Sequence, residues 1–343
     1  MHAHLLPESD SCSPWMNHYL DLVIRGVRSP AITKKIVLHL QRFQQFLVAS
    51  YGHDHLSVCL RRDVLSWQQA LQDQSLAVTT INNHLASLST FTTWVHARQP
   101  ELFPMGDPTK GIRELALPPL EPRTLDATQV RSLKNLCDRL PRYHQRHNGV
   151  LRATARPIRD RAIIFVFLST GLRREELVNL NLNHLEPAEP LLLRSARRAR
   201  MVRVKGKGQT ERSVFLSADA RHALADYLEQ ERPRDTTAET TALFLSATGI
   251  AARADDGRLS PRAINLILEQ IGRWHDADCP DVQRRISPLR PHDLRHTFAF
   301  HLAQTTRADA YELERRLGHR SQRYIQRYTN PPEAVAAGYV EDF

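Results

Sequence analysis

The sequence His292-Asp-Leu-Arg-His296 stands near the C-terminal end of this 343-residue chain. It is followed by Leu317-Gly-His-Arg320 and, nine residues after the histidine of that second motif, by Tyr328. Far upstream lie Arg173, in Ser-Thr-Gly-Leu-Arg, and Lys207, in Gly-Lys-Gly. The chain therefore places two arginines, a lysine, two histidines and a late tyrosine in a fixed order, without a pair of carboxylates to hold a metal ion.

This set of residue types suits attack of a tyrosine hydroxyl on a phosphodiester. The transition state gathers negative charge on the non-bridging phosphate oxygens, and two guanidinium groups can hold both of them. The phenol becomes the covalent carrier, so the energy of the phosphodiester is kept in the enzyme rather than lost to water.

These motifs resemble those of the tyrosine recombinase (phage integrase) family, and the resemblance covers nearly the whole chain. A glutamate follows the first arginine of that family by three residues, as Glu176 follows Arg173 here, and it is expected to orient that arginine. The catalytic residues that the resemblance implies are Arg173, Lys207, His292, Arg295, His319 and Tyr328.

The resemblance also implies a fold, an activity and partners. The expected fold is mainly α with a small antiparallel β-sheet: an N-terminal helical, SAM-like core-binding domain plus an α/β catalytic domain. The expected activity is site-specific recombination, in which DNA is cut and rejoined through a 3′-phosphotyrosine, with no cofactor and no metal. The implied partners are double-stranded DNA with inverted half-sites and other copies of the chain in a tetrameric synapse.

Proline distribution indicates the domain boundaries. Residues 1–115 are expected to form the helical DNA-binding domain, 116–124 a linker, and 125–343 the catalytic domain with a C-terminal tail. Five prolines fall between residues 104 and 123, where they remove the backbone donors that a regular element needs.

Apolar residues recur at helical spacing in the first domain, and one such stretch predicts a helix from about Thr79 to His96. Thr79, Thr80 and Asn82 stand at its start and are expected on its solvent side, as candidates to touch DNA phosphates or base edges. Thr and Asn also cap helices, so the assignment has a structural alternative.

The second domain is expected to contain several helices and one hairpin. An apolar helix over 160–168 is interrupted at Gly171, and a second helix restarts at Arg173. Residues 199–216 are expected to form a hairpin that turns at Gly206-Lys207-Gly208, and further helices are expected over 218–231, 261–275 and 310–317.

The hairpin is rich in positive charge. Residues 194–212 contain eight Lys and Arg against one Glu, which suits a ribbon that follows DNA. The DNA-binding candidates in it are Arg198, Arg200, Arg203 and Lys205. Lys205 also remains an alternative to Lys207 as the acid that protonates the leaving oxygen. The glycine spacing does not fit a nucleotide-binding loop, so ATP is not implied.

Two of the site assignments have rivals in the sequence. His292 and His296 stand four residues apart, a spacing that can seat zinc on a helix, but Arg295 between them would repel a cation. Tyr324 precedes Tyr328 by four residues and could present a phenol instead, although the family spacing selects Tyr328.

Composition agrees with a polyanionic partner. The chain carries 47 Lys and Arg against 37 Asp and Glu, a formal charge of +10. It contains neither an apolar run long enough for a membrane span nor a basic-then-apolar signal sequence, so a cytoplasmic protein is expected. The four scattered cysteines indicate reduced thiols.

Other activities stay open on the sequence. A type IB topoisomerase uses similar chemistry as a monomer, and a non-catalytic DNA-binding relative is a third possibility. Residues 139–161 form a basic stretch that is interpreted as a surface insertion rather than a DNA contact. Residues 333–343 are expected to pack on a neighbouring protomer, with packing on their own protomer as the alternative. A role in a mobile element is expected; the sequence leaves open which kind of element or replicon it serves, its target sequence and its accessory proteins.

Overall fold

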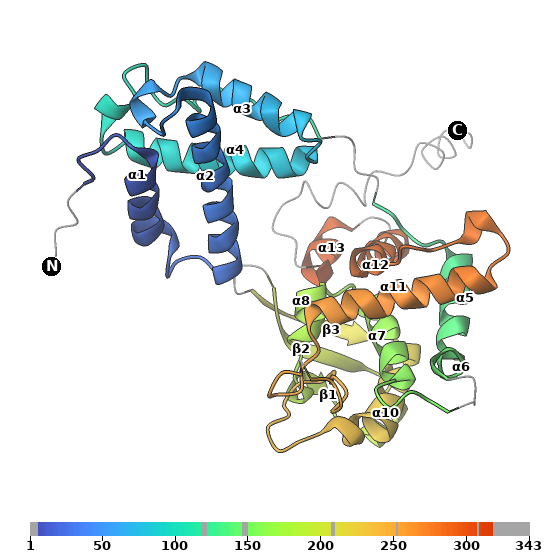
Figure 1. Cartoon of the computed structure of the whole chain (residues 1–343). Coiled ribbons are helices and arrows are strands. Elements are labelled where there is room, and N and C mark those ends of the chain that lie inside the picture. The colour runs from blue at the N-terminus through green and yellow to red at the C-terminus, as the bar shows by residue number, and fades with distance from the viewer. Residues whose placement is uncertain are drawn as a thin grey trace. The chain divides into compact units, whose positions relative to one another are not determined.

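The computed structural model describes residues 6–117, 122–145, 150–206, 210–251, 253–306 and 309–317. The chain divides into two compact units, Met1–Leu120 and Glu121–Phe343, and their elements are labelled in Figure 1. The division falls within the stretch predicted as a linker. The predicted fold class, mainly α with a small antiparallel sheet, is confirmed.

The first unit is helical. Its main helices are α1 (Cys12–Tyr19), α2 (Pro30–Tyr51), α3 (Arg61–Asp73) and α4 (Val78–His96), with a π-helical turn at Leu20–Ile24. Helix α2 begins with Pro30, whose missing N–H costs nothing in a first turn, and ends at Gly52, which has φ of 76°. Large side chains fill the core: the rings of Phe43 and Trp67, for example, meet edge to face at 5.0 Å.

Asn82 does not lie on the solvent side of α4, so that prediction is wrong. Its side chain is buried, Nδ2 donates to the Leu115 carbonyl oxygen (2.9 Å), and Oδ1 accepts from the Leu115 amide (3.0 Å). These two hydrogen bonds satisfy both polar groups of the buried Asn82 side chain. Thr79 is exposed and Thr80 half-buried, as the sequence indicated.

The second unit packs helices around a three-stranded antiparallel sheet of order β1-β2-β3. Its strands are β1 (Leu185–Glu186), β2 (Ala199–Lys205) and β3 (Glu211–Leu216). Its helices are α5 (Ala127–Cys137), α6 (Leu140–His144), α7 (Pro157–Thr170), α8 (Arg174–Val178), α9 (Pro190–Ser195), α10 (Ala218–Gln230), α11 (Pro261–Asp278), α12 (Pro291–Thr305) and α13 (Ala310–Leu317). The hairpin and the helices predicted in this region are present; strand β1 and helices α6 and α9 were not predicted.

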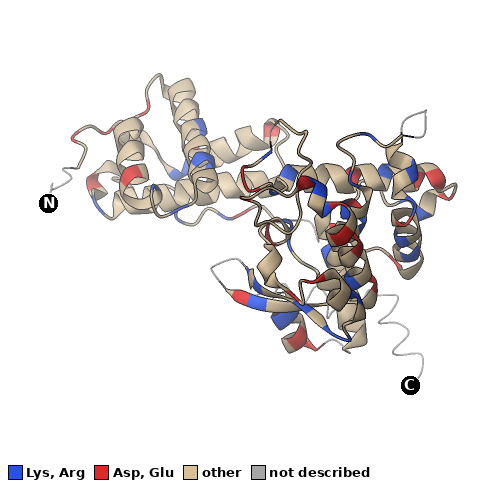
Figure 2. Cartoon of the chain, turned by 90° about the horizontal axis from the view of Figure 1, so that it is seen from below, with Lys and Arg blue, Asp and Glu red and all other residues tan. Residues whose placement is uncertain are grey.

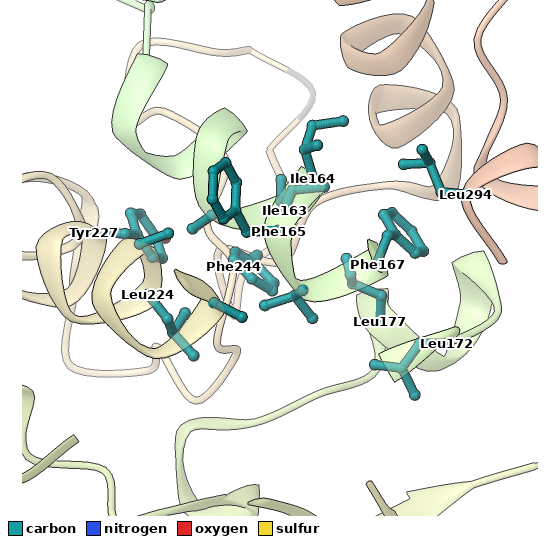
Figure 3. Close-up of a cluster of buried hydrophobic side chains, with 14 of the residues drawn as sticks. Ile163, Ile164, Phe165, Phe167, Leu172, Leu177, Leu224, Tyr227, Phe244 and Leu294 are labelled. Atoms are coloured by element: carbon teal, nitrogen blue, oxygen red, sulfur yellow. The ribbon is translucent and has the colours of Figure 1, made fainter. Parts of the chain in front are cut away.

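Helix α7 forms the centre of this unit. Its apolar residues are not confined to one stripe, because α5, α10, α12 and β3 all pack against it. Figure 3 shows Ile163 and Phe167 of α7 among apolar side chains of α8, α10 and α12. Each such buried side chain stabilises the fold by about 1.5–3 kcal/mol, so the position of the α7 C-terminus is firmly set.

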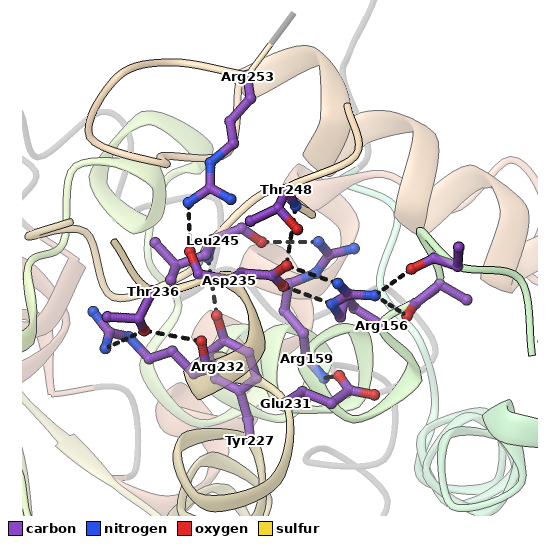
Figure 4. Close-up of polar contacts among 12 residues, drawn as sticks. Arg156, Arg159, Tyr227, Glu231, Arg232, Asp235, Thr236, Leu245, Thr248 and Arg253 are labelled. Atoms are coloured by element: carbon purple, nitrogen blue, oxygen red, sulfur yellow. Dashed lines mark hydrogen bonds and ion pairs between the residues drawn. The ribbon is translucent and has the colours of Figure 1, made fainter. Parts of the chain in front are cut away.

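Most described residues of the stretch between 139 and 154 are exposed, as expected for a surface insertion, but its end is buried. Arg156 and Arg159 are buried, and Figure 4 shows them in a polar network with Asp235 and Glu231. Arg156 binds Asp235 through two hydrogen bonds, Nε to Oδ2 (2.6 Å) and Nη2 to Oδ1 (2.7 Å). For these two arginines the interpretation as surface residues is wrong, because their guanidinium groups anchor the segment that follows α10.

Two further observations bear on the sequence analysis. No helix in the part of the chain that the structure describes is long and apolar enough to cross a membrane. All four cysteines are free thiols.

Candidate active site

The turn that ends α7 places Arg173. Gly171 has φ of 59°, in the left-handed region, and an added Cβ would overlap the ring of Phe298. The chain therefore reverses at this glycine and starts α8 with Arg173 as the N-cap. The backbone N–H of Arg173 donates to Oε2 of Glu176 (2.7 Å), and its Nη1 donates to Oε1 (2.8 Å).

Glu176 gathers three guanidinium groups around one buried carboxylate. Besides Arg173, it accepts two hydrogen bonds from Arg212: from Nη1 to Oε1 (2.9 Å) and from Nη2 to Oε2 (2.7 Å). Nη1 of Arg295 lies 4.0 Å from Oε2. Burial raises the pKa of this carboxyl, but the hydrogen bonds and charges of Arg212, the Arg173 amide and Arg295 outweigh it and hold the pKa at about 2.

Arg295 lies deeper than Arg173. Its side chain is 3% exposed, whereas that of Arg173 is 27% exposed. Nη2 of Arg295 donates to the Leu317 carbonyl oxygen (2.7 Å), and Nη1 donates to that of Gly171. Arg295 therefore joins α12 to the turn before Arg173 and to the end of α13.

His292 shares a cavity with Arg173. The cavity has a volume of about 480 Å³ and is also lined by Arg174 and Arg290. The ring of His292 reaches the surface, yet surrounding protein atoms and the positive charges of Arg295 and Arg174 lower its pKa. A neutral imidazole at this place can donate one hydrogen bond and accept another.

His296 follows His292 by four residues on α12. Their rings are 6.3 Å apart, and the residues that the structure describes contain no group of three or more His, Cys, Asp or Glu that could hold a metal ion.

Lys207, His319, Tyr324, Tyr328 and the tail 333–343 lie outside the described residues. Their assigned roles stay predictions. The described elements come close to them in sequence: β2 and β3 flank Lys207, and α13 ends at Leu317, two residues before His319.

Three of the four basic candidates lie on β2, and Arg198 immediately precedes it. Arg198, Arg200, Arg203 and Lys205 are all exposed. Strict alternation would put Arg203 on the same face as buried Met201, but the register shifts between Met201 and Val204, and Arg203 has φ of 55°. This bulge turns Val204 into the core and Arg203 outward. Figure 2 shows how basic and acidic residues are distributed over the elements.

Two of these cations are also held by the protein. Nε of Arg200 pairs with Oε2 of Glu186 (2.7 Å), and Nη2 of Arg203 donates to the Asn183 carbonyl oxygen (2.8 Å). Both contacts are exposed, where an ion pair contributes about 0–1 kcal/mol, so a phosphate can replace them at little cost.

Sequence reasoning missed two groups. In the first unit, a groove of about 590 Å³ between α2 and α4 is lined by Lys35, His39 and Arg42 together with Asn83 and Ser87. The signal was the seven-residue spacing of Lys35 and Arg42, which places both on one side of α2. In the second unit, Arg212 was counted only as part of the basic ribbon. Its position two residues before buried Val214 indicates an inward side chain.

A family model described as "Phage integrase family" matches residues 123–334. The chain belongs to this family, the tyrosine recombinases. A tyrosine recombinase XerC of Azotobacter vinelandii is 34% identical over 226 residues, which are 65% of this chain and 58% of the relative. A XerC of Haemophilus influenzae is 31% identical over 268 residues, 77% of this chain and 73% of the relative. The chain thus spans less than two thirds of the length of the Azotobacter relative.

Solved structures of the same family share the fold. XerH site-specific recombinase bound to palindromic difH substrate, in a post-cleavage complex, aligns with a TM-score of 0.70 at 18% identity and covers 97% of this chain and 85% of that one. The Tn1549 transposon integrase in complex with circular intermediate DNA aligns with a TM-score of 0.64 at 15% identity, over 96% and 99% of the two chains.

Proposed function

We propose that this protein is a site-specific DNA recombinase that acts through a tyrosine. The Tyr328 hydroxyl attacks a DNA phosphate, the bond from phosphorus to the 5′ oxygen breaks, and a 3′-phosphotyrosine and a free 5′ hydroxyl result. The 5′ hydroxyl of a partner strand then attacks the phosphotyrosine and releases the tyrosine. Each step exchanges one phosphoester for another, so neither ATP nor a cofactor is required.

In this proposal, the site residues that the structure describes bind the scissile phosphate or hold the residues that bind it. Arg173 and Arg295 stabilise the charge that develops on its non-bridging oxygens, and His292 donates a hydrogen bond to it. Glu176 holds the arginines in place without reaching the DNA. Lys207 protonates the leaving 5′ oxygen, and His319 assists at the phosphate.

One observation carries the proposal: the buried carboxylate of Glu176 draws Arg173, Arg212 and Arg295 to one point beside a cavity that Arg173 and His292 line. A single carboxylate does not neutralise three guanidinium groups, so the cluster keeps an excess of positive charge at low dielectric. Such an excess suits an anion, and the cavity gives a phosphate access to it.

The proposed partner is double-stranded DNA with inverted half-sites, bound by four protomers in a synapse. Support comes from the exposed cations of β2 and, in the first unit, from the groove with Lys35 and Arg42. In its solved structure, XerH site-specific recombinase is bound to palindromic difH substrate. A cytoplasmic location and a role in a mobile element belong to the same proposal.

The two alternatives predict different products. A type IB topoisomerase relaxes supercoiled DNA as a monomer, and a non-catalytic relative binds DNA without a covalent adduct. Neither is favoured by the XerC relatives.

A nicked suicide substrate tests the proposal. Loss of the short fragment after cleavage prevents religation, so the protein–DNA adduct accumulates and is resolved on a denaturing gel. Wild type and Tyr324→Phe are expected to give the adduct in EDTA without ATP, and Tyr328→Phe is expected to bind DNA without giving it. An adduct that persists in Tyr328→Phe, or that requires added magnesium, contradicts the mechanism.

A further inference from the structure

Arg212 is an inward-facing arginine on the strand that follows Lys207. It shares a face of β3 with Val214 and Leu216, which are buried, and its own side chain is 9% exposed. Burial of a guanidinium group requires partners for its donors, and this group has them.

The guanidinium group is engaged on three sides. Nη1 and Nη2 bind the two carboxylate oxygens of Glu176 at 2.9 and 2.7 Å, and Nε donates to the carbonyl oxygen of Arg316 at 3.0 Å. Three of its five N–H donors are thus directed to protein atoms. Arg212 is therefore placed to hold other groups of the site rather than to clamp the phosphate.

These contacts join β3 to two parts of the site. Glu176 also binds the backbone and side chain of Arg173. Arg316 is the penultimate residue of α13, three residues before His319. A second contact supports the same connection, because the guanidinium group of Arg316 lies over the ring of Phe215 on β3, 4.8 Å from its centroid.

Backbone pairing in the hairpin also connects Arg212 to the residues next to Lys207. Glu211, next to Arg212, pairs with Lys205 across the hairpin, and the N–H of Gly206 donates to the Thr210 carbonyl oxygen (2.7 Å). The hydrogen-bonded ladder therefore continues from Arg212 to the residue that immediately precedes Lys207. A shift of β3 would move that end of the hairpin with it.

We propose that Arg212 is a positioning residue for strand cleavage: anchored on Glu176 and on the Arg316 carbonyl oxygen, it fixes the hairpin that bears Lys207 against Arg173 and the end of α13. Lysine can replace it only in part, because an ammonium group keeps the charge but lacks the planar fork that binds both carboxylate oxygens and a carbonyl oxygen together. This inference rests on the proposed function, and in particular on Lys207 as the acid.

A DNA substrate with sulfur at the scissile phosphate distinguishes a variant with a misplaced acid from a variant that has lost structure in general. When the 5′ bridging oxygen of the scissile phosphate is replaced by sulfur, the leaving group departs as a thiolate and needs no proton, because the pKa of a thiol lies far below that of an alcohol. Cleavage of the sulfur substrate therefore bypasses Lys207. Single-turnover cleavage of matched oxygen and sulfur suicide substrates measures the difference.

Arg212→Gln is expected to slow cleavage of the oxygen substrate about 100-fold, the size of effect that follows from a displacement of about 1 Å in a catalytic group. On the sulfur substrate the loss is expected to be tenfold or less. Arg212→Lys, which keeps the charge and the fold, should show a smaller loss with the same preference for sulfur. Lys207→Ala, which lacks the acid altogether, should show the largest ratio of sulfur-substrate to oxygen-substrate cleavage rates.

Arg156→Gln is the matched control. Arg156 makes the same kind of buried two-point contact, with Asp235, and its other hydrogen bonds go to the carbonyl oxygens of Ala153 and Ala155, away from Glu176 and α13. Its loss should reduce stability and leave the ratio of sulfur to oxygen rates at the wild-type value.

The outcomes are distinguishable. Equal slowing of Arg212→Gln and Arg212→Lys on both substrates, or cleavage of the oxygen substrate at the wild-type rate, overturns the role of Arg212. Absence of a Tyr328-dependent adduct in the wild type instead overturns the proposed function itself.

Discussion

Nη2 of Arg295 donates a hydrogen bond to the carbonyl oxygen of Leu317, 2.7 Å away. The contact joins α12 to the last residue of α13, and the same guanidinium group also holds the Gly171 carbonyl oxygen at the end of α7. One side chain thus determines how three elements meet, in addition to its proposed role at the phosphate.

Arg295→Gln is therefore expected to impair both stability and cleavage. Two buried carbonyl oxygens lose a charged donor, which costs about 1–3 kcal/mol, and adduct formation should fall at least 100-fold because transition-state charge is no longer stabilised. Thermal unfolding and the suicide substrate measure the two effects. Arg262→Gln, an exposed arginine on α11, is the control, and equal stability of the two variants would contradict the structural role.

The buried carboxylate of Glu176 is expected to make the free energy of unfolding depend on pH. Its pKa in the folded protein is about 2, below the ordinary value of 4.5, so folding favours the ionised form. The stabilisation is complete above about pH 5 and is lost as pH falls through the folded pKa, and it amounts to about 3 kcal/mol.

The measurement is the free energy of unfolding between pH 5 and pH 2 for the wild type and Glu176→Gln. The variant should lose less stability than the wild type over that range, because its side chain does not titrate. Glu175→Gln removes an exposed neighbouring carboxylate and should follow the wild type. Parallel curves for the wild type and Glu176→Gln would show that the carboxylate is not held in this way.

Gly171→Ala is expected to destabilise the second unit by about 2–4 kcal/mol, since alanine pays for a positive φ and its Cβ overlaps Phe298. Gly52→Ala, at φ of 76° with open space around the added Cβ, should cost only the backbone part, about 1–2 kcal/mol. The double variant Gly171→Ala, Phe298→Ala tests the overlap: the two costs should not add, and strict additivity would exclude the clash.

Elements with a local cause could be predicted from sequence. The hairpin of β2 and β3 follows from alternating apolar residues around Gly206, and the break at Gly171 follows from a glycine after an apolar run. Features that depend on distant partners could not. The pairing of Arg212 with Glu176 joins residues 36 positions apart, and that of Arg156 with Asp235 joins residues 79 apart.

Asn82 shows why polarity alone misleads. A polar side chain is expected in water, but Asn82 is buried because the Leu115 backbone supplies both a donor and an acceptor for it. No pattern near Asn82 specifies that partner. Arg203 is the opposite case: strict alternation would put it on the face of buried Met201, but the register with β3 shifts between Met201 and Val204, and Arg203 is exposed, as its charge predicts.

Substitutions of Lys205 and Lys207 are expected to have different effects on cleavage of the oxygen and sulfur substrates. Lys207→Ala should abolish cleavage of the oxygen substrate and recover on the 5′ sulfur substrate, because only the proton donor is lost. Lys205 is exposed on β2, so Lys205→Ala should weaken DNA binding and lower its salt dependence without a preference for sulfur. If the sulfur substrate restored cleavage by Lys205→Ala but not by Lys207→Ala, Lys205 would be the proton donor instead of Lys207.

The C-terminal tail gives the last prediction. Residues 333–343 follow Pro331-Pro332 and include the apolar residues Val335, Tyr339, Val340 and Phe343. Prolines oppose continuation of a helix through them, and a short apolar segment gains stability only against another surface. We expect residues 333–343 to pack on a neighbouring protomer in the DNA-bound assembly.

Deletion of residues 334–343 tests this arrangement. The truncated protein should bind a single half-site with unchanged affinity, because one protomer suffices there, but should bind the full site with reduced cooperativity, because the contact between protomers is lost. Gel-shift titrations on half-site and full-site DNA measure the affinity of one protomer and the cooperativity between protomers separately. A variant with Val335, Val340 and Phe343 changed to serine keeps the chain length and should behave like the deletion. Full-site cooperativity and strand exchange at wild-type levels in both variants would mean that the tail packs on its own protomer.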